Sequence, residues 1–265
     1  MLVDYHIHTS LSSDAQGEVL DCVKVACSEK LEEIGISEHY IQERFRNKLC
    51  IPMGYKKVSE YFRKMKTFKK KKMSHVKLKF GIEVDFIPGF ENEIKEELKR
   101  IPFDYVIGSV HFINNWGFDH PKYISEYQKW DILELYEAYF SIVQNCAKSG
   151  IFDIIGHLDL IKKFGYKPKG DISELYLATA KALKESQVCV EVNTSGLRHP
   201  CHEIYPNKQL LKMCYEEGVQ ITLGSDAHMP EDVGKDFNKA LNMIKEVGYE
   251  QIVKFTKRKR QLATI

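Results

Sequence analysis

The chain has 265 residues, of which 43% are hydrophobic, so it is long enough to bury a full core as one domain over residues 1–265. Its 39 basic and 37 acidic residues leave a net charge of +2, which gives no general reason to expect a polyanionic partner such as nucleic acid. The first residues lack the regions of a signal peptide, and no apolar run is long enough to span a bilayer. We therefore expect a soluble cytoplasmic protein, whose oligomeric state the sequence does not indicate.

Seven apolar runs typical of β-strands alternate with helical patterns along the chain. The strands are expected over residues 2–8, 34–39, 76–85, 105–112, 153–158, 188–193 and 220–224. The clearest helices are expected over residues 19–31, 131–148, 173–186, 207–217 and 237–247. Continuous apolar strands separated by helices predict a parallel sheet that is buried on both faces.

Seven such units favour a closed or nearly closed α/β barrel over an open doubly wound sheet. A Rossmann sheet would need a Gly-rich phosphate-binding turn after the first strand, and residues 8–13 contain no glycine. Polar residues with chemical capability follow nearly every predicted strand, and active sites of barrels form at these C-terminal strand ends. We therefore expect the functional site there.

Two features are interpreted as structural. Residues 63–79 are strongly basic, with four lysines at 69–72. They predict a solvated helix face and loop, and a nucleic-acid contact is the alternative.

The seven cysteines include no Cys-x-x-Cys pair, which argues against a disulfide framework or a zinc ribbon. Most of them should be small buried residues.

Histidines and carboxylates gather at the ends of the predicted strands. His6 and His8 would lie on one face of the first strand, an arrangement that suits one metal ion or two hydrogen-bonded core histidines. Glu83 lies in an apolar strand, where burial of an unpaired carboxylate is costly, so it needs a partner such as a cation. The full set of candidates is His6, His8, His39, Glu83, His111, His157, Asp226 and His228.

Six of the ten histidines fall at predicted strand ends, and this enrichment predicts a site for several metal ions. The other four histidines are interpreted as surface or loop residues. They are His75, His120, His199 and His202, of which His202 lies closest to the suspected chemistry.

These motifs resemble those of the PHP (polymerase and histidinol phosphatase) family, in order from residue 4 to residue 228. The His-x-His start, the glutamate of the third strand and the Asp-x-His end carry the resemblance. It implies a distorted (β/α)7 TIM-like barrel that holds two to three divalent metal ions, which are zinc, iron or manganese in this family.

The resemblance also implies a ligand set. His6, His8, Glu83 and Asp226 would hold one metal ion, and Glu83 would bridge to a second ion bound by His111 and His157. Asp14, His39 and His228 would hold a third, although some family members have histidine at the place of Asp14.

Three stretches look most like the histidinol-phosphatase branch of the family, namely residues 81–85, 156–160 and 191–198. The implied reaction is hydrolysis of the small phosphomonoester L-histidinol phosphate to L-histidinol and phosphate in histidine biosynthesis. We expect a hydroxide held between the first two metal ions to attack phosphorus in line.

Several residues are candidates for contacts around the phosphate. The planar guanidinium of Arg198 suits bidentate contact with it, and Lys162, Lys163 and Asn193 are further candidates for substrate binding. Asp226 or His202 would supply a proton to the leaving alkoxide. Asp85 and Asp159 are expected to orient imidazoles that bind metal.

Two other functions remain open at this point. A phosphodiesterase or nuclease could use the same metal ions, but it needs a basic groove with aromatic platforms, and the lysines at 69–72 are the main candidate for one. A non-catalytic metal-binding module would be expected to have lost ligands, whereas the set here is essentially complete.

Overall fold

The computed structural model describes residues 2–41, 55–70 and 75–265, with the backbone alone for 55–57, 69 and 70. The side chains of the lysines at 69–72, for which a nucleic-acid contact was the alternative, therefore lie outside the described residues, as does Cys50. The other six cysteines are unpaired, and all but the half-buried Cys27 are buried, as predicted.

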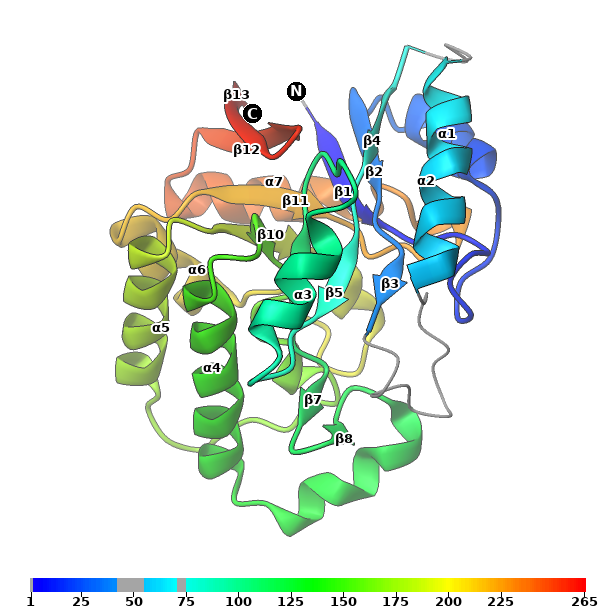
Figure 1. Ribbon diagram of the computed structural model, residues 1–265. Coiled ribbons are helices and arrows are strands. Elements are labelled where there is room, and N and C mark those ends of the chain that lie inside the picture. The colour runs from blue at the N-terminus through cyan, green and yellow to red at the C-terminus, as the bar shows by residue number, and fades with distance from the viewer. Residues whose placement is uncertain (1, 42–54, 71–74) are drawn as a thin grey trace.

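Two parallel sheets form the centre of the molecule (Figure 1). One has the strand order β1-β2-β4 and the other the order β11-β10-β9-β6-β5-β3. Their strands are β1 (Val3–Ile7), β2 (Glu33–Ile36), β3 (His39–Tyr40), β4 (Lys77–Phe80), β5 (Glu83–Asp85), β6 (Ile107–Ser109), β9 (Ile154–Ile155), β10 (Cys189–Asn193) and β11 (Ile221–Gly224). In every strand except the edge strands β3 and β4, all residues are buried. This confirms the prediction that the parallel strands are covered on both faces.

The two sheets continue into each other through strands that are interrupted. The pair β2 and β3 replaces the single strand predicted over 34–39, and the pair β4 and β5 replaces the one over 76–85. On the other side, β1 meets β11 through the isolated parallel bridge between Ile7 and Ala227. The backbone N–H of His8 donates to the carbonyl of Ala227 there, at 2.9 Å. Among the described residues, the parallel ladders thus make two sheets and no closed barrel.

In the described part of the chain, seven α-helices surround the sheets (Figure 1). They are α1 (Val19–Ser28), α2 (Tyr55–Lys70), α3 (Glu91–Leu98), α4 (Ile132–Lys148), α5 (Ser173–Glu185), α6 (Lys208–Glu216) and α7 (Phe237–Val247). Asp131 caps α4 by accepting hydrogen bonds from the backbone N–H groups of Leu133 and Glu134. The five helices predicted most clearly are present. Within the described residues, no helix is long and apolar enough to cross a membrane.

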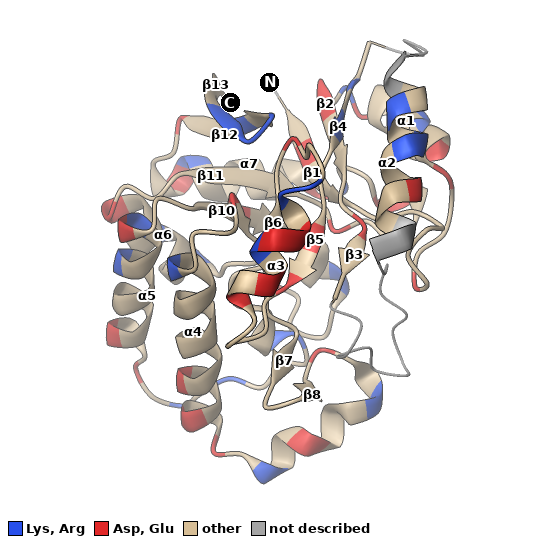
Figure 2. Ribbon diagram, in the orientation of Figure 1, with Lys and Arg blue, Asp and Glu red and all other residues tan. Residues whose placement is uncertain are grey.

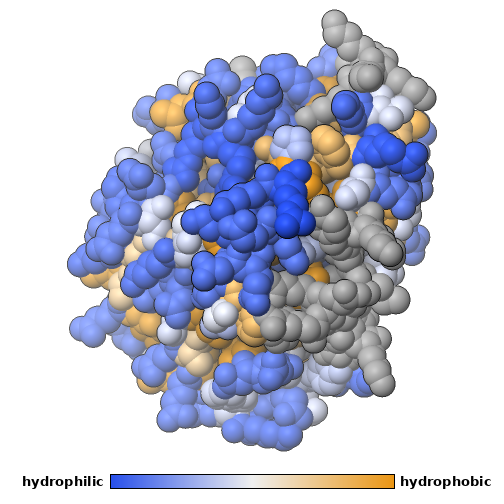
Figure 3. Space-filling view, viewed as in Figure 1, coloured by the Kyte–Doolittle hydropathy of each residue, from blue (hydrophilic) through white to orange (hydrophobic). Residues whose placement is uncertain are grey.

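Charged side chains of both signs lie on the outer helices, whereas Lys and Arg residues predominate on α2 and on the C-terminal hairpin (Figure 2). On the face seen in Figure 3, hydrophilic side chains predominate and hydrophobic ones show in small patches between them. This distribution is that of helices with one face packed against the sheets and the other in water.

Two antiparallel hairpins were not predicted. The first is formed by β7 (Phe112–Ile113) and β8 (Trp116–Gly117), and the second by β12 (Gln251–Thr256) and β13 (Lys259–Thr264). In the second hairpin, the backbone N–H of Phe255 donates to the Tyr5 hydroxyl at 3.2 Å, and the two rings pack edge to face. This hairpin therefore closes the core beside β1.

The ring of Tyr105 fills the space beside the interrupted strands. A Cβ atom at Gly35 would lie 1.9 Å from Tyr105 Oη, and one at Gly81 would lie 2.2 Å from Tyr105 Cζ. The Tyr105 hydroxyl donates to the carbonyl of Tyr5 at 2.7 Å, so the ring cannot move away without loss of that bond. These glycines are required for close packing.

We expect Gly81→Ala to lower the free energy of unfolding by about 2 kcal/mol, because the added methyl group overpacks the core against Tyr105. Chemical denaturation of the variant and the parent measures the difference. Gly170→Ala is the matched control, since a Cβ there meets nothing within 4 Å. Equal stability of the Gly81 variant and the parent would show that the Tyr105 ring is not fixed.

Candidate metal centre

The structure brings all nine predicted metal ligands to one end of the sheets. Each lies in a strand or shortly after one, except for Asp14, which lies between β1 and α1. The set is His6, His8, Asp14, His39, Glu83, His111, His157, Asp226 and His228. The bridge between Ile7 and Ala227 places the first pair of histidines beside the last two ligands.

The Glu83 carboxylate lies in the middle of this cluster and is buried. Its Oε1 atom is 3.0 Å from His157 Nε2 and 3.3 Å from His6 Nε2. Its Oε2 atom is 2.6 Å from His39 Nδ1, the residue directly opposite it in the β3–β5 ladder. One carboxylate thus contacts imidazoles on both sides, as a bridging ligand would.

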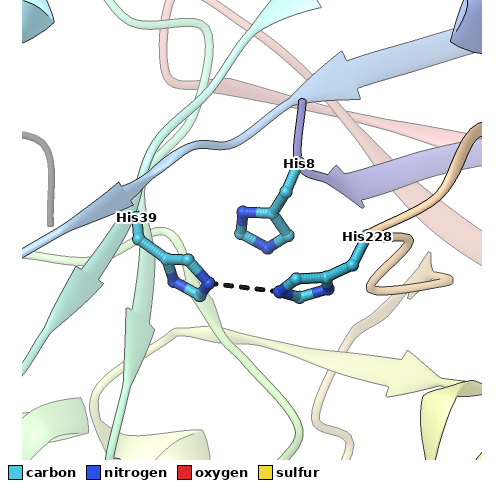
Figure 4. A group of neighbouring side chains, drawn as sticks. All are labelled: His8, His39 and His228. Atoms are coloured by element: carbon cyan, nitrogen blue, oxygen red, sulfur yellow. Dashed lines mark hydrogen bonds between the residues drawn. The ribbon is translucent and has the colours of Figure 1, made fainter. Parts of the chain in front are cut away.

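Three imidazoles form the outer part of the cluster (Figure 4). His8, His39 and His228 face one another, and each offers a nitrogen within 4.8 Å of the others. The Nε2 atoms of His39 and His228 are 3.3 Å apart. Asp14 Oδ2 lies 3.5 Å from the first of these atoms and 3.6 Å from the second.

The inner part of the cluster has the same character. His6 forms two groups that could hold a metal ion, one with Glu83 and His157 and one with His8 and Asp226. Asp226 Oδ1 lies 3.6 Å from His6 Nε2 and 3.4 Å from His8 Nε2.

Several of these nitrogen atoms lack a hydrogen-bond partner although they are buried. Among the described residues, His6 Nε2 and His8 Nε2 make no hydrogen bond. Buried polar atoms without a partner are rare, and each requires an explanation such as a bound ion. Imidazole nitrogens and carboxylate oxygens are the donors that zinc, iron and manganese accept. The residues therefore fit a cluster of divalent metal ions.

His8 and Glu83 have the protonation states of metal ligands, whereas His6 and His39 would lose a proton on binding metal. Burial lowers the pKa of His6 and of His39, but neighbouring carboxylates, Glu83 among them, outweigh it and raise both pKa values well above the usual one. Burial, together with the charges of His39 and His228, lowers the pKa of His8 to about 3, so its imidazole is neutral at pH 7. Burial raises the pKa of Glu83, but the charges of His6 and His39 outweigh it and hold the pKa well below its usual range. A neutral imidazole and an ionised carboxylate bind metal without first losing a proton.

A cavity of about 630 Å³ opens at this cluster. Arg198 and Lys163 contribute positive charge to its wall, as predicted for a phosphate site. Arg198 Nη2 donates to the carbonyl oxygens of Ser225 and Asp226, at 2.6 and 3.3 Å, and Nε lies 3.5 Å from Asp232 Oδ2. Nη1 is buried without a partner among the described residues. Two of the three guanidinium nitrogens are thus engaged within the protein, so the side chain does not present the free bidentate fork expected from the sequence.

The sequence matches the PHP domain family over residues 4–195. The chain belongs to the PHP domain family. A relative named "Probable histidinol-phosphatase", from Deinococcus radiodurans, is 35% identical over 260 residues that cover 98% of each chain. A histidinol-phosphatase from Lactococcus lactis is 28% identical and covers 96% of this chain and 94% of its own.

A solved structure agrees with these matches. The crystal structure of histidinol phosphate phosphatase from Lactococcus lactis, complexed with zinc, L-histidinol and phosphate, has a TM-score of 0.84 to this chain. It is 25% identical in sequence, and the match covers 98% of each chain. The fold of this PHP chain is therefore that of a known phosphatase over nearly its whole length.

Two carboxylates in the PHP chain orient imidazoles of the cluster. Asp85 Oδ1 lies 2.7 Å from His111 Nδ1, in the role expected for it. Glu191 Oε1 lies 2.7 Å from His6 Nδ1, and its Oε2 accepts from the backbone N–H of His157 at 2.8 Å. Such contacts fix the ring and direct its other nitrogen at the metal.

Sequence reasoning missed the role of Glu191. The signal was present, because Glu191 is a carboxylate in a continuous apolar strand, like Glu83. Gly224 on the neighbouring strand makes room for it, since a Cβ there would lie 1.9 Å from Glu191 Oε1.

Four other expectations do not fit the placement of the residues. Asp159 is bound to Lys162 Nζ at 2.8 Å and to the backbone N–H of Asn207, and no imidazole of the described residues contacts it. Lys162 is buried and also donates to the carbonyl of Ile204, so its charge is used within the protein. Because Asp159 and Lys162 pair with each other, neither is free to act in the site, and the sequence does not reveal this pairing.

The side chain of Asn193 is also occupied. Its amide donates to Glu191 Oε2 at 2.9 Å and accepts from the backbone N–H of Ser195 at 2.8 Å, and the residue is fully buried. It therefore supports Glu191 rather than reaching a substrate. His202 is exposed and does not line the cavity. His120 and His199, which were interpreted as surface or loop residues, lie in loops, and both line the cavity.

Replacement of Glu191 by glutamine should lower zinc affinity roughly 10- to 100-fold, the usual effect of losing an orienting carboxylate. Competition with a coloured chelator measures the affinity, and circular dichroism checks the fold. Glu185→Gln, at the exposed end of α5, should leave the affinity unchanged. Parental affinity in the Glu191 variant would show that this residue only packs against His6.

Proposed function

We propose that this protein is a metal-dependent phosphomonoesterase and that its substrate is L-histidinol phosphate. The observation that carries the proposal is the cluster of unpartnered buried imidazole nitrogens around Glu83, at the mouth of a cavity with cationic side chains. The full-length similarity to relatives named histidinol-phosphatase, and to a phosphatase bound to zinc, L-histidinol and phosphate, supports this substrate. We further propose a role in histidine biosynthesis in the cytoplasm.

We propose that residues 1–265 form one domain in which the two sheets make up a distorted seven-stranded barrel. The interrupted strands on one side and the bridge between Ile7 and Ala227 on the other support this arrangement. Within it, two to three divalent ions would be held by the nine ligands in the grouping of the PHP family. The distances around Glu83 support its bridging role.

Phosphate monoesters resist attack because they are anionic, and their uncatalysed hydrolysis is very slow. Metal ions at these ligands would neutralise phosphoryl oxygens and lower the pKa of a bound water molecule toward about 7. The protein's own residues hold and orient the substrate. Arg198 and Lys163, which both line the cavity, would donate to phosphoryl oxygens.

Asp226 remains the candidate for proton transfer, since His202 lies away from the cavity. Its Oδ2 atom accepts a hydrogen bond from Ser195 Oγ at 3.2 Å, and the side chain lines the cavity. Burial raises the pKa of Asp226, but the charges of His6 and His228 help to hold it well below its usual range. The carboxylate is therefore ionised at pH 7, and in this role it would relay a proton from a bound water molecule to the leaving alkoxide without holding it.

A screen with three substrates tests the proposal. We expect faster hydrolysis of L-histidinol phosphate than of p-nitrophenyl phosphate or of a single-stranded oligonucleotide. Treatment with a chelator should abolish the activity, and zinc or manganese should restore it. Faster cleavage of the oligonucleotide would instead support the nuclease. Among the described residues that line the cavity, none belongs to the basic helix α2, so no observation favours that alternative.

We expect Arg198→Ala to lower kcat/KM for L-histidinol phosphate roughly 30-fold or more, because a charged hydrogen bond to phosphate is lost. This factor corresponds to about 2 kcal/mol of transition-state stabilisation. Steady-state kinetics measure this change. Metal content should be measured as well, since Arg198 also binds the backbone of Asp226. Arg260→Ala, on the exposed C-terminal hairpin, is the control. Parental kinetics in the Arg198 variant would contradict the role in phosphate binding.

A further inference from the structure

The cavity extends well beyond the metal cluster, and its far wall has no role in the reaction described above. That wall comes from the segment that contains the β7–β8 hairpin and the start of the 3-10 helix η2 (Pro121–Lys129), with two side chains from later loops. Its lining residues include Phe112, Asp119, His120, Tyr123, Lys163 and His199. A cavity built for phosphate alone would not need this wall.

Asp119 supplies a negative charge there. Its Oδ2 atom lies 3.3 Å from Lys163 Nζ, and within the described chain Oδ1 makes no hydrogen bond. About a quarter of the side chain (24%) remains exposed. Burial raises the pKa of Asp119, but Lys163 outweighs it and holds the pKa below its usual value, so the group is ionised at pH 7. A carboxylate can accept about four hydrogen bonds, and here only one weak contact is made.

An ionised carboxylate is unexpected in a cavity that must admit a phosphate dianion. Like charges at short range disfavour binding, and they do so more strongly in a partly buried site. The repulsion becomes an attraction when the substrate also carries a cation a few bonds from its phosphate. An ammonium group has three donors and no acceptor, which matches the unused acceptor sites of Asp119.

The neighbouring side chains fit the rest of such a substrate. Burial, together with the charge of Lys163, lowers the pKa of His199 to about 4, so its imidazole is neutral and adds no charge. The rings of Phe112 and Tyr123 give the wall an apolar surface on which a flat or aliphatic group can lie. A carboxylate beside an aromatic surface is suited to an amine that bears a ring.

We propose that Asp119 is the specificity residue that accepts the ammonium group of an amino-alkyl phosphate in this cavity. The proposal rests on the proposed phosphatase function and adds to it the group that selects the substrate. Lys163 then lies between the two charges of the substrate, in contact with Asp119 on one side and available to phosphate on the other.

A simpler role for Asp119 would be to hold Lys163 in place for phosphate. The two roles differ in one measurable way. If Asp119 only positions Lys163, its loss weakens every phosphate ester alike. If it accepts the ammonium group, its loss weakens esters that carry an amine more than those that do not.

The experiment compares kcat and KM for L-histidinol phosphate and for 3-(imidazol-4-yl)propyl phosphate, the same ester without the amine. The metal-loaded parent should prefer the ester with the amine. In Asp119→Asn, the ratio of the two kcat/KM values should fall about tenfold or more, mainly through KM, because one charged contact is lost. Asp119→Glu keeps the charge and should retain part of the preference.

Two further variants serve as controls. Lys163→Met should weaken both esters by a similar factor. Glu126→Gln, which removes a lysine-paired carboxylate on the same segment but outside the cavity, should leave the ratio at the parental value.

Equal losses for the two esters in Asp119→Asn, or no loss for either, would overturn the assignment of Asp119 while the phosphatase function stands. A metal-loaded parent that hydrolyses neither ester would overturn the proposed function and this inference with it.

Discussion

Imidazole nitrogens around Glu83 face one another in pairs at hydrogen-bonding distance. The Nε2 atoms of His39 and His228 are 3.3 Å apart, and those of His111 and His157 are equally close. A single N–H can satisfy each pair only if the rings hold complementary tautomers, and buried carboxylates already engage the other nitrogens of some of these rings. Divalent cations would satisfy all the lone pairs together, which is why metal binding is central to our account.

The order of the strands places the residues that follow β1 beside those that follow β11 at this cluster. The short bridge between Ile7 and Ala227 brings residues separated by more than two hundred positions into contact. Asp4 strengthens that junction, since its carboxylate accepts from the backbone N–H of Ser225 and from that of Gly234. The metal cluster thus depends on a junction that forms only when the whole sheet order is complete.

The features that follow from hydrophobic pattern and strand periodicity could be predicted from the sequence. The seven strand regions, the burial of both sheet faces and the meeting of the strand ends are of this kind. The interruptions after Ile36 and after Phe80 were not predicted. The close packing of Gly35 and Gly81 could not be predicted either, because it depends on the ring of Tyr105, which comes from a distant part of the chain. The short strands of the two antiparallel hairpins also carry too weak a pattern to be recognised.

The site could be predicted where a residue type is costly to bury without a ligand, as for Glu83 and the histidines. It could not be predicted where the outcome depends on which neighbour takes up a charge. Lys162 and Lys163 are adjacent in the sequence, yet one is neutralised inside the protein by Asp159 and the other faces the cavity. For the same reason the role of Glu191 became visible only once His6 was placed beside it.

The most direct test of this account is the number of metal ions per chain, determined by elemental analysis of the purified protein and of His157→Ala. His157 contacts Glu83 directly, whereas His75 is exposed and away from the cavity, so His75→Ala is the matched control. The account predicts two to three ions in the parent and in the His75 variant, and at least one fewer in a folded His157 variant. A parent that binds less than one ion per chain, or a His157 variant with the full complement, would contradict it.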